Sequence, residues 1–128
     1  MHELLESLIE SLKGGIDVLN DLLALDVLIG PETLDRAIGL LEADTITRFE
    51  SQSSKRECFH VKGDHHTTYL CVEDFCSCHG FAARSDRIIP MCKHLLAVQL
   101  SIGLQVGRTV FLSDDIFGDM LDVNKLNN

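Results

Sequence analysis

Apolar residues in the first part of the chain recur every three or four positions, which is the spacing of one helix face. They are Leu4, Leu5, Leu8, Ile9, Leu12, Ile16, Leu19, Leu22 and Leu23. A glycine pair, Gly14 and Gly15, interrupts this pattern and predicts two helices, over residues 2–13 and 16–29. Pro31 suits a first helical turn, so we expect a third helix to begin there and to end near Asp44.

The hydrophobic pattern then changes from a helical period to alternation. Residues 45–49 alternate and are rich in β-branched side chains, as expected of a strand. Residues 58–61 and 67–72 have the same character, and short polar turns separate the three segments. Such closely spaced strands predict a three-stranded antiparallel meander.

The last part of the chain returns to helical periodicity. Residues 76–90 show no regular pattern, whereas the apolar residues from Leu95 to Ile102 predict a helix that stops at Gly103. Residues 109–112 predict a short strand, and Ser113 is a typical cap for a final helix. That helix carries Ile116, Phe117, Met120 and Leu121. The predicted fold class is therefore α+β, with an N-terminal helical segment (1–44), a central meander and helix (45–103) and a C-terminal strand and helix (104–128) in one compact domain.

Length and composition narrow the class of protein. A chain of 128 residues corresponds to one domain with a small core. It contains no apolar run long enough to cross a bilayer. Its first ten residues lack the basic start and unbroken apolar stretch of a secretory signal, so we expect a reducing compartment. In such a compartment the five cysteines are better explained as metal ligands than as disulfides.

Charge is divided unevenly along the chain. The net charge is −9, and residues 1–44 hold ten acidic residues against two basic ones. Residues 45–94 hold seven basic residues against six acidic ones. Because an acidic surface repels a phosphate backbone, any contact with nucleic acid is expected from this middle part or through a partner.

Two ligand doublets, Cys76/Cys78 and Cys92/His94, are separated by thirteen residues. Three thiolates and one imidazole form a complete tetrahedral zinc set. Residues two apart in a helix point in different directions, so Cys92 and His94 can share a metal only where the helix begins. Pro90 and the apolar run from Leu95 predict such a beginning.

Four protein ligands leave no open coordination position, which favours one structural Zn²⁺ over a catalytic metal and argues against a zinc hydrolase. The deaminase pattern of H-x-E with P-C-x-x-C is absent, and so is a glycine-rich phosphate loop. We therefore expect a protein that is not an enzyme.

The doublets CxC and CxH, followed by Leu-Leu-Ala-Val, are the pattern of the SWIM zinc finger. The chain further resembles the Sws family, the small stand-alone SWIM subunits of the Shu complex. The most specific part of this resemblance is the segment TTYLCVEDFCSCHGFAARSDRIIPMCKHLLAVQLS. His79 departs from the expected pattern and is an additional potential ligand.

The resemblance implies a nuclear protein, with the cytoplasm as an alternative location. It implies a non-catalytic adaptor that forms a heterodimer with a RecA-fold paralogue of the strand-exchange recombinase. The pair would help the recombinase assemble or persist on single-stranded DNA in homologous recombination, with DNA reached through the complex. No membrane and no small-molecule substrate are expected. Zinc ligation carries over to Cys76, Cys78, Cys92 and His94.

Other cysteines and histidines have two interpretations each. Cys58 and Cys71 fit small buried residues on strands; Cys71 could instead be an alternate ligand, and the two could form a redox pair. The histidines His60, His65 and His66 fit solvated turns, and a second metal site is the alternative.

Two further groups of residues could contact a partner. Arg84, Arg87 and Lys93 could bind phosphate or a protein, or could be solvated. Leucines of the first helix, notably Leu5, Leu8 and Leu12, exceed what a small core can bury and predict a partner-binding face. The alternative function is a direct single-stranded nucleic-acid-binding zinc module, although the chain has one tyrosine and no tryptophan for base stacking.

Overall fold

The computed structural model describes residues 24, 27, 29–73, 75–78 and 91–127. Within this part of the chain, no helix is both long and apolar enough to cross a bilayer. The helix predicted over 2–13 and most of the one predicted over 16–29 lie outside the described residues, as do Leu5, Leu8 and Leu12. The same holds for His79, Arg84 and Arg87.

The third predicted helix is confirmed as α3, Pro31–Glu42, with Pro31 in its first turn. It buries Thr33, Leu34 and Ala37 on one face. Asp44 follows the helix with a positive φ of 56°, which turns the chain toward the sheet.

The sheet has five strands, so the prediction of a simple three-stranded meander is wrong. The strands are β1 (Ile46–Ser51), β2 (Glu57–Lys62), β3 (Thr68–Val72), β4 (Phe75–Cys76) and β5 (Arg108–Leu112), in the order β4-β3-β2-β1-β5. The first four strands pair antiparallel in sequence order, and β5 pairs parallel with β1. The sequence did not predict β4, because its two residues are too few to show an alternating pattern. The strand predicted over 109–112 does form, as β5, but no local pattern indicates that it pairs with β1 at the edge of the sheet opposite β4.

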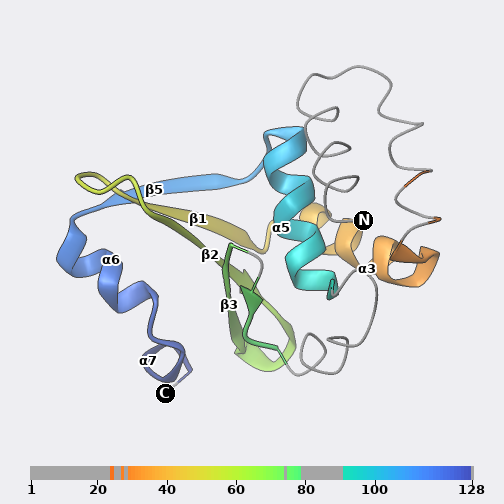
Figure 1. The fold of residues 1–128 in the computed structure, drawn as a ribbon. Helices are drawn as coiled ribbons and strands as arrows, with labels where there is room; N and C mark the ends of the chain where they lie inside the picture. Colours follow the sequence, from red (N-terminus) through yellow and green to blue (C-terminus); the bar gives the residue numbers. More distant parts are fainter. Residues whose placement is uncertain (1–23, 25–26, 28, 74, 79–90, 128) are drawn as a thin grey trace.

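Three described helices come after β4 in the chain: α5 (Lys93–Leu104), α6 (Asp114–Met120) and α7 (Val123–Leu126). The predicted helices near 95–102 and 116–121 are thus confirmed as α5 and α6. The first runs one residue beyond the predicted stop at Gly103, to a left-handed cap at Gln105. Figure 1 shows α5 beside α3 at one end of the sheet, and α6 with α7 beyond the other end of β1 and β5.

Two cores lie against the sheet because successive strand residues point to opposite faces. In β2, Phe59 and Val61 join the core beneath α3 and α5, where Leu95, Leu96 and Leu100 are fully buried. Cys58, between Glu57 and Phe59, joins the second core with Leu70 of β3 and Phe117 of α6. The larger core is the one that contains all the predicted cysteine ligands.

Candidate metal centre

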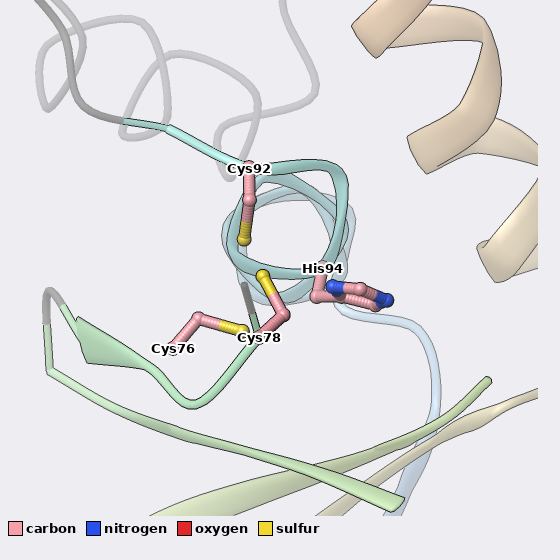
Figure 2. A group of neighbouring side chains, drawn as sticks. All are labelled: Cys76, Cys78, Cys92 and His94. Carbon is pink, nitrogen blue, oxygen red and sulfur yellow. The ribbon is translucent and has the colours of Figure 1, made fainter. Parts of the chain in front are cut away.

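The four predicted ligands come together in the folded chain. The potential ligand atoms of Cys76, Cys78, Cys92 and His94 all lie within 4.8 Å of one another, and all four residues are buried. Figure 2 shows the three sulfur atoms converging beside the first turn of α5, with the His94 ring next to Cys78. This compact arrangement has the donor set and the dimensions of a tetrahedral Cys₃His site.

The beginning of α5 explains how Cys92 and His94 reach the same point. Cys92 is the N-cap of the helix and has extended backbone angles, φ −91° and ψ 168°. Its sulfur accepts a hydrogen bond from the backbone N–H of Leu95, at 3.3 Å. His94 is the second residue of the helix, so the pair spans the change from extended to helical backbone. The predicted geometry at a helix start is confirmed.

The other doublet lies where β4 ends. Cys76 is the last residue of β4, and Ser77 fixes the chain just beyond it. The backbone N–H of Ser77 donates to Leu70 O at 3.0 Å, and its Oγ accepts from Leu70 N at 2.9 Å. These two bonds continue the pairing with β3 past the strand end and direct Cys78 back toward Cys76.

The thiols are difficult to ionise without a cation. A hydrogen bond with Cys76 and burial raise the pKa of Cys92 to about 12. A hydrogen bond with Cys71, together with burial, also raises the pKa of Cys76. Three buried sulfurs this close would repel one another as thiolates, so a divalent cation is needed to hold them in the deprotonated, metal-binding form.

The imidazole completes the fit to zinc. Nδ1 of His94 is buried and has no hydrogen-bond partner among the described residues. A buried nitrogen without a partner is costly, and coordination would satisfy it. The donor set therefore fits Zn²⁺, held by Cys76, Cys78, Cys92 and His94. When bound, the ion would supply a cross-link between the end of β4 and the start of α5, with no position left for substrate.

Two neighbours of the site lie outside the predicted ligand set: Tyr69, which the sequence did not indicate, and Cys71, which the sequence allowed as an alternate ligand. The ring of Tyr69 stacks on His94, with 4.1 Å between centroids. Cys71 pairs with Cys76 in the β3–β4 register, and the thiols of the two residues are hydrogen-bonded. Cys71 lies outside the group of four, which makes it a buried neighbour of the ligands. Its position five residues before Cys76 was the available signal for this contact.

The remaining candidates do not form a second site in the described part of the chain. Cys58 lies in the core on the other face from Cys71, because Phe59 is the residue opposite Cys71, so a disulfide between the two is ruled out. His65 and His66 are exposed, as predicted for solvated turn residues. His60 is buried instead, and its Nε2 lies 2.8 Å from the backbone oxygen of Met120.

Comparison with known proteins identifies relatives over most of the chain. No profile of a known protein family matches it, and no solved structure does. The human protein "Zinc finger SWIM domain-containing protein 7" is 36% identical over 110 residues, which cover 81% of this chain and 76% of the human protein. The mouse protein of the same name is 29% identical over 128 residues, which cover 94% and 82% of the two chains. With its buried Cys₃His cluster and this similarity, the chain belongs to the family of zinc finger SWIM domain-containing protein 7, as its resemblance to the stand-alone SWIM proteins predicted.

Proposed function

We propose that this protein is a non-catalytic adaptor that pairs with a RecA-fold paralogue of the strand-exchange recombinase. The pair would promote assembly or stability of the recombinase filament during homologous recombination, in the nucleus. The observation that carries the adaptor role is the buried Cys₃His cluster in a chain of the SWIM family. Four protein donors fill a tetrahedral zinc, so the metal supports structure and does not present a reactive water.

The position of the cluster supports a role in building a docking surface. It lies where β4 meets α5, and the core behind it contains Leu95 and Leu96. Because no such site forms in the unfolded chain, the free energy of zinc binding becomes folding free energy for this region. A docking surface built from α5 and the adjoining strands would therefore form only in the metal-bound protein.

Co-expression with the RecA-fold paralogues of the same organism tests the proposal. We expect one paralogue to co-purify with the zinc-loaded chain at equal stoichiometry and to be lost from the Cys92→Ser/His94→Ala variant. The matched control is Cys58→Ser, which changes a buried thiol in the other core and leaves the ligands intact. If the double variant stayed folded and still bound the paralogue, zinc would not be the scaffold; if no paralogue bound the zinc-loaded chain, the assigned partner would be wrong.

A further inference from the structure

A cavity of about 510 Å³ opens beside His94 of the metal centre, and none of the three cysteines of the cluster lines it. Its wall includes His94 and Lys93 from the start of α5, Lys62 from the end of β2, and His65 and Thr67 from the turn before β3. Leu40, Ala43 and Thr45, from the end of α3 and the turn after it, also line it, so three separate segments of the chain, 40–45, 62–69 and 93–94, meet at the cavity. Its most distinctive property is the charge of the side chains that line it.

Two side chains of the cavity wall, Lys62 and Lys93, are cations. Among the other described cations, Arg36, Arg48, Arg108 and Lys125 each lie within ion-pair distance of an aspartate or glutamate. Lys55 and Arg56, before β2, are unpaired within the described residues, like the two lysines of the cavity, but they do not line it. Lys62 and Lys93 have no such partner among the described residues, although the chain carries a net charge of −9 and carboxylates are abundant. None of the described residues of the cavity wall is acidic.

Neutral hydrogen-bond donors add to these cations. Thr67 and Tyr69, whose side chains carry hydroxyl groups, are also part of the wall. The cavity also adjoins the N-terminus of α5, a helix of twelve residues whose first backbone N–H groups carry partial positive charge. Cations, hydroxyl donors and a helix N-terminus around one cavity are the features that bind an oxyanion.

We propose that this cavity binds a phosphate group, and that the natural source is a phosphodiester of a nucleic-acid backbone. The ring of Tyr69 is already stacked on His94, so the site offers charge without a free aromatic platform for a base. Such a contact holds the backbone independently of base sequence. The inference rests on the charges of the cavity and stands whether or not the recombinase paralogue is the partner.

The test is a titration of the zinc-loaded full chain with a thymidine oligonucleotide and, separately, with inorganic phosphate, followed by NMR of the backbone amides. We expect both probes to shift the resonances of Lys62 to Thr67 and of Lys93. Replacing one phosphate-binding lysine removes about one unit from the slope of log affinity against log salt concentration. Lys62→Glu should therefore lower oligonucleotide affinity by about tenfold at low salt and reduce that slope.

Lys55→Glu is the matched control, because Lys55 is also exposed, lies in the β1–β2 turn and is not part of the cavity wall. It should leave affinity and salt slope unchanged, and zinc content should be equal in both variants. Equal losses from the two substitutions would overturn the proposal, because they would indicate attraction by overall charge. Resonance shifts confined to other surfaces would overturn it too. Saturation by an oligoglutamate peptide, with no response to either phosphate probe, would assign the cavity to an acidic protein segment instead.

If inorganic phosphate produced these shifts and the oligonucleotide did not, the cavity would take free phosphate and the nucleic-acid assignment would be wrong.

Discussion

The ring of Tyr69 in β3 lies against the imidazole of His94 in α5, at 4.1 Å between centroids and an interplanar angle of 30°. This contact joins β3 of the sheet to His94 of the candidate metal centre. Contacts that orient a metal ligand typically affect metal affinity by about ten- to a hundredfold. We therefore expect Tyr69 to support zinc binding without being a ligand.

Replacing this ring should weaken the metal site. We expect Tyr69→Ala to lower zinc affinity by about tenfold, because His94 would lose the surface that fixes its ring. Tyr69→Phe keeps the stacked ring and should keep wild-type affinity. Competition with a chromophoric chelator measures both variants; equal affinity of Tyr69→Ala and wild type would show that the stack does not position His94.

Gly63 allows the Tyr69 ring to lie where it does. A Cβ added at Gly63 would come within 2.5 Å of Tyr69 Cε2. Because that ring is held against His94, it cannot move away freely. We expect Gly63→Ala to destabilise the protein by about 1–3 kcal/mol, as overpacking does, with a lower zinc affinity.

Chemical denaturation of the zinc-loaded protein measures the effect of Gly63→Ala. Gly39→Ala is the control, since an added Cβ at this position meets no atom within 4 Å. Gly39 lies within α3, where alanine is favoured over glycine by about 1 kcal/mol, so the control should be neutral or stabilising. A neutral Gly63→Ala variant would show that Tyr69 has room to move.

Metal analysis should distinguish ligands from neighbours in the cysteine cluster. Protein purified under reducing conditions should contain one zinc per chain, and Cys78→Ala should lose it. Cys71→Ala should retain one zinc, because Cys71 contacts the Cys76 thiol from outside the four-residue group. The opposite result, in which Cys78→Ala keeps one zinc per chain and Cys71→Ala loses it, would show that Cys71 is the ligand and Cys78 the neighbour.

Removal of the metal should have a structural effect at the same end of the sheet. We expect a strong chelator to abolish the cooperative unfolding transition of the α3–α5 core, because zinc binding supplies part of its folding free energy. Circular dichroism and amide exchange would follow this change, and added zinc should reverse it. A chelated protein with an unchanged thermal transition would contradict the structural role of the ion.

Acid should destabilise the second core through His60. Burial lowers the pKa of His60 below its ordinary value of 6.5, against the opposing effect of its hydrogen bond to Met120 O. The unfolded chain then binds a proton more readily than the folded one, so stability is full above pH 6.5 and falls as the pH drops below it. Urea midpoints at pH 7.5 and 5.5 measure the loss.

His60→Gln removes the titrating group and keeps an amide that can donate to Met120 O. It should cost about 1 kcal/mol at pH 7.5 and reduce the difference between the two midpoints. The zinc site makes both proteins sensitive to acid. The contribution of His60 is therefore the amount by which the change in urea midpoint between pH 7.5 and 5.5 is smaller in His60→Gln than in wild type. If the midpoint changed equally in the two proteins, His60 would not be responsible for the acid sensitivity.

Local sequence was sufficient for much of this structure. Pro31, the alternation in residues 45–72 and the apolar run from Leu95 predicted elements that the structure confirms. The four ligands were also predictable, because each doublet is a local pattern and Cys₃His is a complete zinc set. The structure also confirmed why Cys92 and His94 can act together, since that depends only on where one helix begins.

The sequence by itself thus determined the four candidate ligands, the helices α3, α5 and α6 and the central strands, because these depend on neighbours within a few residues; the short helix α7 was not predicted. Only the tertiary structure decided that β5 pairs with β1, that Tyr69 stacks on His94 and that Lys62 and Lys93 share a cavity. Each of these relationships joins residues separated by some twenty to sixty positions, for which no local period exists. They are fixed by packing around the two cores, and so they became visible only in the folded protein.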